Sequence, residues 1–504
     1  DPFSPRTLKV STINGENGVF RLMSDLSLGK TDTITAGNVN GLEFIQIYQN
    51  PSNILLTPSS DMVVASATSL GNGADFKGIA TIIGLYDYLP ILQKRDAGGG
   101  LNQWVLSAIT RNPNQTAKSL LNIFSLPYQI FRLESDNLYT RTDDLIYPPT
   151  LYGLWAKVSG GGIYQKQPYG GKTTQNLFYH FSGGYDYGES FETQRYFYGG
   201  SLDYTHLNAA DSGYKGNVKA IGLGAYGGYI QQEGWVLDGS LRYVYAPMHT
   251  NLYQSDVPIN FNAHLLILGA RAGYRFYPFF TYRTKVVEKC VQKVFCRNAR
   301  VQAKIKDIHT YLEPYVSLNP GFISGGKVSF TDKQSQSLIT AKLNPVPTFI
   351  SKIGLMGVRR YDYHQGSLNL KALMEYSMDL NLGGKITLND LSNAPLYNDA
   401  NHLDHRLGMG LGAQWSSLNE SLNLFADFKT EFFGRLNTYW LLSAGLRYKF
   451  GQTPQKTSWG KNYRPAPIRK KSSKPKNFLK PYQPPVKNGS DSFYEKNHFK
   501  TFPS

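Results

Sequence analysis

From about residue 150 to Phe450 the chain breaks into segments of roughly ten residues in which apolar and polar residues alternate. In residues 422–432, one face of an extended strand carries Leu422, Leu424, Ala426, Phe428 and Phe432, and the other carries Asn423, Asp427, Lys429 and Glu431. Residues 368–380 repeat the pattern. Because one face suits lipid and the other suits water, these segments predict the strands of a transmembrane β-barrel. A soluble β-sandwich also alternates and is the alternative fold.

Twelve such segments are predicted as strands, near residues 151–163, 175–187, 195–207, 216–231, 234–247, 263–276, 308–319, 351–362, 367–381, 405–416, 421–433 and 438–450. An even number of strands brings both ends of a barrel to the same side of the membrane. The predicted fold is therefore all-β, with a 12-stranded transmembrane barrel over residues 150–450.

The composition agrees with a barrel wall. No stretch of eighteen consecutive apolar residues is present, so the sequence predicts no transmembrane helix. The 35 Tyr and 27 Phe suit the aromatic girdles of a membrane barrel. A protein of the outer membrane must be exported, yet the chain begins at Asp1 with neither an initiator Met nor a signal peptide. We therefore expect an N-terminal portion to be missing.

The net charge of +17 lies in two segments. Residues 451–504 hold 12 Lys or Arg against Asp491 and Glu495, and residues 278–306 hold 8 against Glu288, which gives +10 and +7. The rest of the chain is formally neutral, which argues against a nucleic-acid-binding fold. The turn after every even strand would face the periplasm, so both basic segments are expected there, where peptidoglycan or anionic lipid headgroups are the candidate partners. A merely solvated tail is the alternative.

Residues 111–149 form the predicted linker to the barrel, and within it residues 115–146 read as helical with a break or restart at Pro127. A helix from Tyr128 to Leu145 would be about 27 Å long, close to the thickness of a bilayer core. Its mixed charges suit a wet lumen, so we predict that this helix spans the pore. A surface helix would have a similar sequence.

The flanking regions differ in kind. Residues 1–110 are β-rich with turns such as Asn14-Gly15 and Asn40-Gly41, whereas residues 451–504 contain eight prolines and much Lys and are predicted to be disordered. Cys290 and Cys296 are the only cysteines, and they are predicted either to form one local disulfide or to remain thiols. They lack the neighbouring ligands of a zinc site, so no metal or cofactor is expected.

Three parts of the sequence resemble the type Va autotransporters, in the order of that family. Residues 7–48 resemble the last rungs of a pertactin-like β-helix passenger, which implies the end of a right-handed parallel β-helix in residues 1–110. Residues 75–106 resemble the module that closes this helix and nucleates passenger folding. The residues that carry this likeness are Phe76, Gly84, Tyr86, Tyr88 and Trp104.

The barrel is also similar to the family, from Leu154-Trp155-Ala156-Lys157 to Gly445-Leu446-Arg447-Tyr448-Lys449-Phe450. The resemblance implies that the last strand, through Gly445, Leu446, Tyr448 and Phe450, is the signal read by the barrel-assembly machinery. Two features depart from the family, because 54 residues follow Phe450 and a basic insertion separates the sixth and seventh strands.

The resemblance implies an outer-membrane translocator and anchor of a Gram-negative bacterium. It would contact outer-membrane lipid and lipopolysaccharide, and would display its own N-terminal passenger, an adhesin or a toxin, at the cell surface. A porin-like channel with an N-terminal β-domain is the alternative. Catalysis is not expected, because Gly-x-Ser-x-Gly and His-Glu-x-x-His are both missing from the sequence.

Residues Glu134 to Leu138 resemble the in-pore cleavage segment of the serine-protease autotransporters of enteric bacteria. In that group the first residue of an Asn-Asn pair attacks its own carbonyl through its side-chain amide. Here the pair is Asp136-Asn137, and the Asp136 carboxylate has no such nitrogen. Self-cleavage by this route is therefore not expected, and the passenger is predicted to stay attached or to be cut by another protease.

Overall fold

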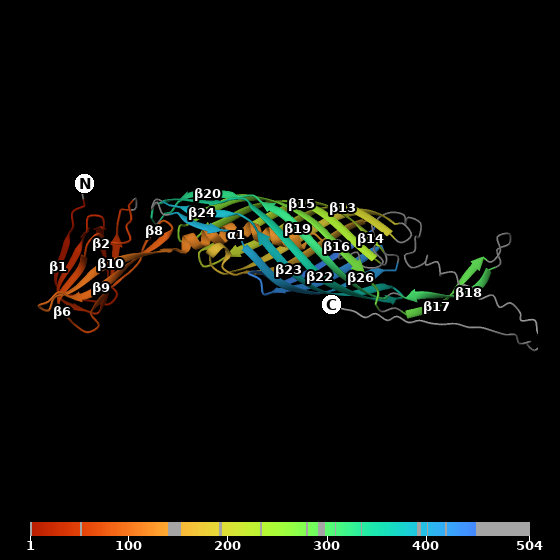
Figure 1. Ribbon diagram of the computed structural model, residues 1–504, viewed down its shortest axis with the longest axis horizontal. Coiled ribbons are helices and arrows are strands. Elements are labelled where there is room, and N and C mark those ends of the chain that lie inside the picture. The colour runs from red at the N-terminus through yellow and green to blue at the C-terminus, as the bar shows by residue number, and fades with distance from the viewer. Residues whose placement is uncertain are drawn as a thin grey trace, which may run out of the picture. The chain divides into compact units, whose positions relative to one another are not determined.

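The computed structural model describes residues 3–50, 53–139, 153–190, 194–231, 234–278, 281–290, 298–307, 309–333, 335–390, 395–400, 402–418 and 421–449. Side chains are described over these ranges except at residue 190 and in residues 281–290 and 298–307. Nearly all of the regular structure is β (Figure 1).

Twelve antiparallel strands close into one barrel, with the first strand paired to the last from Leu154↔Tyr448 to Gln165↔Leu436. These strands are β11 (Gly153–Gln165), β12 (Thr174–Ser190), β13 (Gln194–Ala210), β14 (Tyr214–Gln231), β15 (Gly234–Leu252), β16 (Val257–Arg275), β19 (Thr310–Ile323), β22 (Val346–Tyr363), β23 (Gly366–Asn381), β26 (His402–Ser417), β27 (Leu422–Phe432) and β28 (Leu436–Tyr448). The prediction of a 12-stranded barrel is confirmed, and each of the twelve predicted segments overlaps one of these strands.

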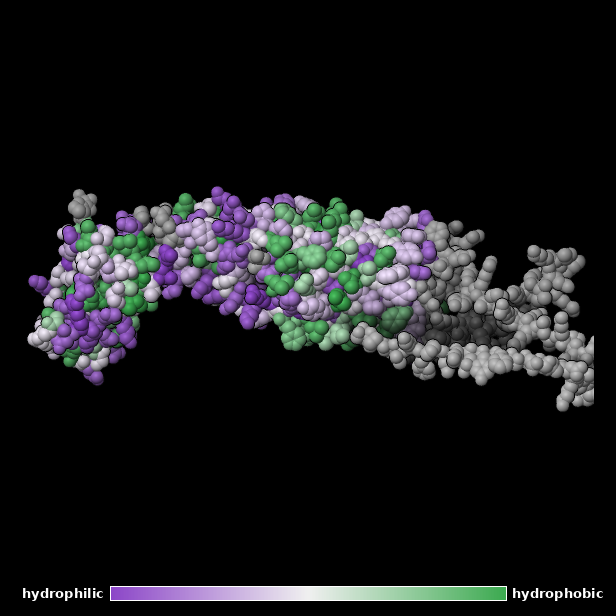
Figure 2. All heavy atoms as spheres, viewed as in Figure 1, coloured by the Kyte–Doolittle hydropathy of each residue, from purple (hydrophilic) through white to green (hydrophobic). Residues whose placement is uncertain are grey.

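The two faces of each strand meet different surroundings. On β16, Leu266 and Leu268 point outward with 44% and 47% of their surface exposed, whereas Arg271 and Arg275 point inward and are buried. Exposed apolar and aromatic side chains continue around the outer wall, and Figure 2 shows hydrophobic residues gathered over the strands. The predicted alternation therefore matches an apolar exterior and a polar lumen.

The strands that connect barrel strands beyond the wall were not predicted. Two hairpins form a separate four-stranded sheet of β20 (Gly326–Thr331), β21 (Leu338–Leu343), β24 (Lys385–Asn389) and β25 (Leu396–Asp399). This sheet, which we call the loop sheet, is made by the connections that follow β19 and β23. The basic insertion forms a further hairpin of β17 (Thr281–Cys290) and β18 (Asn298–Asp307).

The N-terminal residues form a coil of parallel strands that ends in an antiparallel layer. One parallel sheet contains β1 (Thr7–Asn14), β4 (Thr33–Asn40) and β6 (Met62–Leu70), and the other contains β2 (Val19–Asp25), β5 (Leu42–Tyr48) and β7 (Asp75–Gly78), with β3 (Lys30–Thr31) pairing antiparallel to β2. The next strands, β8 (Thr81–Ile83), β9 (Tyr86–Asp96) and β10 (Asn102–Pro113), pair antiparallel, and β10 also covers the edge of β6.

A single helix, α1 (Gln115–Asp136), joins this coil to the barrel. Asn114 caps it by accepting a hydrogen bond from the Ala117 amide at 3.0 Å. The predicted break at Pro127 is wrong, because the helix continues through it. A proline inside a helix costs about 3 kcal/mol, and burial of almost every residue from Thr116 to Ser135 offsets that cost. The helix also ends at Asp136, ten residues before the predicted end, and residues 140–146 lie outside the described part of the chain.

With 22 residues, α1 is about 33 Å long, enough to span a bilayer core. Figure 1 shows it inside the barrel. None of the helices in the described residues is long and apolar enough to cross a membrane in contact with lipid.

Candidate functional site in the barrel lumen

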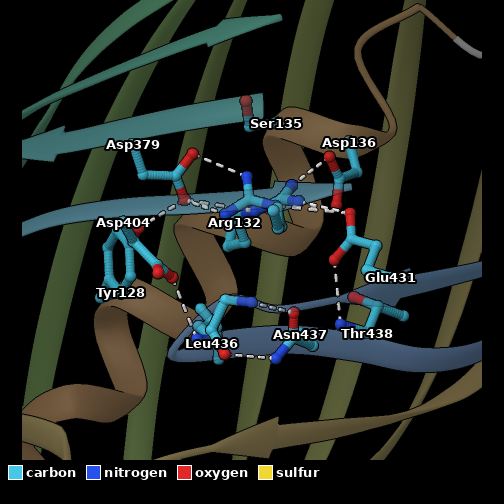
Figure 3. A network of polar contacts seen from close by, with 12 residues as sticks. Tyr128, Arg132, Ser135, Asp136, Asp379, Asp404, Glu431, Leu436, Asn437 and Thr438 are labelled. Carbon is cyan, nitrogen blue, oxygen red and sulfur yellow. Dashed lines mark hydrogen bonds and ion pairs between the residues drawn. The ribbon is translucent and has the colours of Figure 1, made fainter. Parts of the chain in front are cut away.

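Charged side chains near the C-terminal end of α1 meet opposite charges on the barrel wall. Arg132 lies 2.6 Å from Glu431 Oε1 and 3.4 Å from Asp379 Oδ2, measured from guanidinium nitrogens, and also pairs with Asp136 one turn along the helix. Figure 3 shows Arg132 between these carboxylates. The Arg132 side chain is 2% exposed, so the pairing replaces water almost completely.

The wall organises its two carboxylates through a second guanidinium. Arg406 on β26 binds both oxygens of Asp379, at 2.5 and 2.6 Å, and its Nε lies 3.5 Å from Glu431 Oε1. Tyr128, one turn before Arg132, donates its hydroxyl to Asp379 at 2.7 Å. A bidentate guanidinium-carboxylate pair has a fixed geometry, so the acceptors of Arg132 are held in place by the wall itself.

Asp136 meets the reverse arrangement. Its carboxylate lies 2.5 Å from the Lys352 ammonium on β22, and Lys352 is 3.5 Å from Glu375. Lys429 on β27 completes the group at 2.5 Å from Glu375 and 3.6 Å from Glu431. The wall therefore places two carboxylates, those of Asp379 and Glu431, beside Arg132, and two ammonium groups, those of Lys352 and Lys429, near Asp136.

Glu134 points to a different part of the wall. One carboxylate oxygen lies 2.9 Å from Arg242 on β15, and the other accepts the Thr205 hydroxyl of β13 at 2.6 Å. His180 on β12 hydrogen-bonds Thr205 at 2.7 Å. The next helix residue, Ser135, accepts a hydrogen bond from Asn319 on β19 at 2.8 Å.

Each of the three charged residues on this turn of α1 thus has a matched partner on a separate sector of the wall. A shift of the helix by one residue would move Arg132, Glu134 and Asp136 away from these partners and leave buried charges unpaired. Removing one partner of a buried ion pair costs about 3–5 kcal/mol. We call this set of contacts the lumen lock. It consists of Arg132, Glu134 and Asp136 on α1, with Arg242, Lys352, Asp379, Arg406, Lys429 and Glu431 on the wall.

Farther toward the N-terminal end of α1, Gln129 and Phe124 contact uncharged groups of the wall. Gln129 donates to Gln165 at 2.6 Å and accepts from Asn176 at 2.8 Å. Phe124 packs on Phe261 with ring centroids 5.3 Å apart. A cavity of about 100 Å³ remains beside the other end of the helix, lined by Asp136, Lys157, Lys352, Glu375, Asp427 and Lys429 among others.

The lock includes part of the segment that resembles a cleavage site. Asp136 is the last helical residue, and its carboxylate forms ion pairs with Arg132 and Lys352. Asn137 caps the helix, and its side-chain amide donates to the Leu133 carbonyl at 3.0 Å. The Asn137 amide nitrogen therefore bonds back to the helix.

Two of the five residues singled out in residues 75–106 pack together in the N-terminal coil. Trp104 on β10 is 1% exposed, and its ring meets Phe76 edge-on at a centroid distance of 4.9 Å. The Trp104 indole also donates to the Asp75 carboxylate at 2.8 Å. Phe76 lies on β7, the last parallel strand, whereas Trp104 lies in the antiparallel layer, so this contact joins the two.

Gly84 lies where this layer meets the barrel loops, and Tyr86 and Tyr88 follow it on β9 with ring centroids 6.2 Å apart. The Gly84 amide donates to Ser335 Oγ at 3.1 Å and the Leu85 amide donates to Asp390 at 2.8 Å, and both acceptors lie in loops of the loop sheet. The Asn114 side chain donates to the Gly84 carbonyl at 2.9 Å, and the Asn114 backbone N–H donates to the Leu85 carbonyl at 3.0 Å. Burial raises the pKa of the adjacent Tyr86 hydroxyl.

The remaining predicted residues are only partly described. On β28, Leu446 and Tyr448 face outward, and Gly445 packs closely enough that an added Cβ would lie 2.6 Å from the Ala156 carbonyl oxygen. Phe450 lies outside the described residues. Cys290 ends β17 without a described side chain, and Cys296 is also outside, so the disulfide stays a prediction.

The wall partners of the lumen lock were not identified from the sequence. Asp379 and Glu431 lie on the polar faces of two predicted strands, and this position is the one feature of the sequence that indicates a place in the lumen. Which polar residue meets which helix residue depends on the barrel register and on the depth of the helix, and neither follows from alternation.

Comparisons with known proteins give concordant results. Residues 154–284 match the family model described as the autotransporter beta-domain. The serine protease SepA autotransporter of Shigella flexneri is 23% identical over 454 residues, which is 88% of this chain and 30% of that protein. The serine protease EspP of Escherichia coli is 22% identical over 456 residues, which is 88% of this chain and 31% of that protein. The chain thus spans about a third of these relatives.

Among solved structures, the chain is similar to the β-domain of the Bordetella autotransporter BrkA, with 18% identity, 60% of this chain and 100% of that chain covered, and a TM-score of 0.44. It is also similar to the translocator domain of NalP from Neisseria meningitidis, with 14% identity, 65% and 97% covered, and a TM-score of 0.43.

Proposed function

We propose that this chain, which carries the β-domain of an autotransporter, brings an N-terminal passenger across the outer membrane and then anchors it, with α1 left in the lumen. The lumen lock is the single observation that most supports this function. A diffusion channel needs an open path, whereas here the lumen holds a helix whose charges are matched by the wall. The same helix is covalently continuous with the N-terminal coil at its other end.

The direction of the chain supports export of the N-terminal part. When the barrel strands are counted from β11, the odd-numbered strands all finish at the same end of the barrel. The loop sheet and the N-terminal coil lie at that end. The β17–β18 hairpin follows the sixth barrel strand, β16, and the twelfth strand, β28, ends at Tyr448, so the hairpin and the end of β28 lie at the opposite end of the barrel. With the coil outside the cell, the two basic segments would lie in the periplasm, where we propose an anionic partner such as peptidoglycan or anionic lipid.

We further propose that the passenger stays attached. The Asp136 carboxylate lacks an amide nitrogen and is engaged by Arg132 and Lys352, while the Asn137 amide bonds to the helix. An uncut chain would remain fixed to the membrane through α1. The passenger itself is proposed to be an adhesin or a toxin. Residues Gly445 to Phe450 are proposed as the signal for the barrel-assembly machinery, and lipopolysaccharide as a surrounding lipid.

Surface labelling of cells that export the full chain tests this function. An epitope inserted next to Arg6, before the first strand, should bind antibody on intact cells, and the displayed chain should run as one uncleaved species. As a control, an epitope after Lys487 in the C-terminal segment should be labelled only after the outer membrane is permeabilised. Labelling of the Arg6 epitope only in permeabilised cells would contradict export, and release of that epitope into the medium would contradict retention.

A further inference from the structure

The outer wall of the barrel carries a polar patch on the side formed by β13, β14, β15 and β16. Outward positions near the ends of β13, β14, β15 and β16 that face the loop sheet bring together two ammonium groups, two imidazoles and four amides. Its members are His206, Asn208, Lys215, Asn217, Lys219, His249, Asn260 and Asn262. We call this set the outer polar patch.

Strand pairing sets these residues in rows. His206 lies opposite Lys219 across β13 and β14, and Asn208, Asn217, His249 and Asn260 form one continuous row over the four strands. The rows just below are apolar or aromatic, with Ile221 56% exposed and Leu223 62% exposed.

The imidazoles are held in place. His206 stacks on Tyr179 with ring centroids 4.7 Å apart and hydrogen-bonds Asn208 at 3.0 Å. His249 hydrogen-bonds Asn260 at 3.1 Å. Ordered donors of this kind lose little freedom when a ligand binds.

The height of the patch coincides with the membrane surface. Tyr229, at the far end of β14, belongs to the lower aromatic girdle with Tyr196 and Trp235. From Tyr229 to Lys219 the strand advances ten residues, which at about 3.3 Å per residue and a tilt of about 40° is a rise of roughly 25 Å. An outward apolar band is about 25 Å tall, so Lys219 and His206 lie at its upper edge and the Asn217 row lies in the headgroup layer.

The charged residues of the outer polar patch, Lys215 and Lys219, are both positive. Among the described outward positions of β12 to β16, Glu189 is the only carboxylate, and it lies at the far end of β12. On another side of the wall, the outward positions at the corresponding end of β23 are Tyr376, Met378 and Leu380, which carry no charge.

We propose that the outer polar patch binds the phosphorylated sugar headgroup of lipopolysaccharide in the outer leaflet. Ammonium groups match phosphate, and neighbouring Asn and His side chains match phosphate and sugar hydroxyls through hydrogen bonds. The absence of carboxylates from the upper part of these outward positions removes the repulsion that such a ligand would meet. The proposal rests on the placement of the barrel in the outer membrane, and it adds a defined binding site on one side of the wall.

Titration of the full chain in detergent with purified lipopolysaccharide tests this site. Lys219→Glu should weaken binding by about tenfold or more, because it replaces an ammonium group that attracts phosphate with a carboxylate that repels it. Lys342→Glu, on an exposed lysine of the loop sheet outside the patch, is the matched control and should leave the affinity unchanged. Dephosphorylated lipopolysaccharide should bind less tightly to the unaltered chain, and phosphatidylglycerol vesicles should compete poorly.

Equal effects of Lys219→Glu and Lys342→Glu, or equal affinity for dephosphorylated lipopolysaccharide, would overturn the site. Equal affinity for phosphatidylglycerol would show a general anionic surface and would also overturn it. If Lys219→Glu fails to fold, Lys215→Glu makes the same test at the rim of the patch. Because surface labelling of the Arg6 epitope measures export independently, failure of this site and failure of the proposed function are distinguishable.

Discussion

Asp136, the last residue of α1, places its carboxylate 2.5 Å from the Lys352 ammonium on β22. Arg132 faces the opposite charges of Asp379 and Glu431 one helical turn away. The two pairings have opposite polarity, so a translation or rotation of the helix that preserves one pairing loses the other. This relationship gives α1 one preferred depth in the barrel.

Arg132→Glu should loosen the helix while leaving the barrel strands paired. The new carboxylate would face Asp379 and Glu431, and loss of one partner of a buried pair costs about 3–5 kcal/mol. Hydrogen–deuterium exchange of residues 128–136 should become faster, with exchange of β14 and β15 unchanged. Arg132→Lys, which keeps a positive charge beside Asp379 and Glu431, should exchange more slowly than Arg132→Glu. Unchanged exchange in the Arg132→Glu variant would show that the charge pairing does not hold the helix.

Trp104→Ala should destabilise the N-terminal coil and leave the barrel intact. Removing this 1% exposed indole opens a cavity beside Phe76 and costs roughly 3–5 kcal/mol. Residues 3–113 at the cell surface should then become sensitive to added protease. Trp104→Phe keeps an aromatic ring and loses the hydrogen bond to Asp75, at a cost of about 1 kcal/mol, so it should remain largely resistant. Equal resistance of the alanine variant would contradict the role of Trp104 in the core.

Gly84→Ala tests the contact between the coil and the loop sheet. Gly84 has a φ of +55°, and an added Cβ would lie 2.3 Å from Asp390 Oδ2, the atom that binds the Leu85 amide. Gly98→Ala is a matched control, because Gly98 also has a positive φ, of +89°, but nothing lies within 4 Å of its added Cβ. Both variants lose about 1–2 kcal/mol from the backbone, and only Gly84→Ala should also speed amide exchange at Leu85. Similar exchange at Leu85 in both variants would count against this docking.

Much of the barrel follows from alternation, because an outward face in lipid and an inward face in a polar lumen impose a period of two on every spanning strand. This rule located all twelve strands, including β16 with its outward Leu266 and inward Arg271. It did not locate β20, β21, β24 and β25, which pair with one another beyond the wall. It also could not anticipate that α1 continues through Pro127, because propensity alone omits the packing that surrounds this residue.

The charge partners of α1 illustrate the same limit. Arg132 and Asp136 could be assigned to a helix in a wet lumen from their sequence positions. Their partners Asp379, Glu431 and Lys352 lie more than two hundred residues away in the chain, and only barrel closure brings them together.

Trypsin added to intact cells should spare the basic insertion. The β17–β18 hairpin leaves the barrel at the end opposite the loop sheet, which places Arg283 and Lys306 in the periplasm when the coil is outside. Cleavage between these residues should appear only after the outer membrane is permeabilised. A loop-sheet lysine such as Lys342 is accessible from the other side and supplies the positive control. Cutting of the insertion in intact cells would reverse the assigned orientation.

Single-channel conductance in planar bilayers tests most directly that α1 fills the lumen of a translocator. The full chain should conduct poorly, and a variant lacking Gln115–Asp136 should show a large and steady conductance, because the lumen lock would lose its helix. A large, steady conductance in the full chain that does not rise when the helix is deleted would contradict this function and favour a porin-like channel.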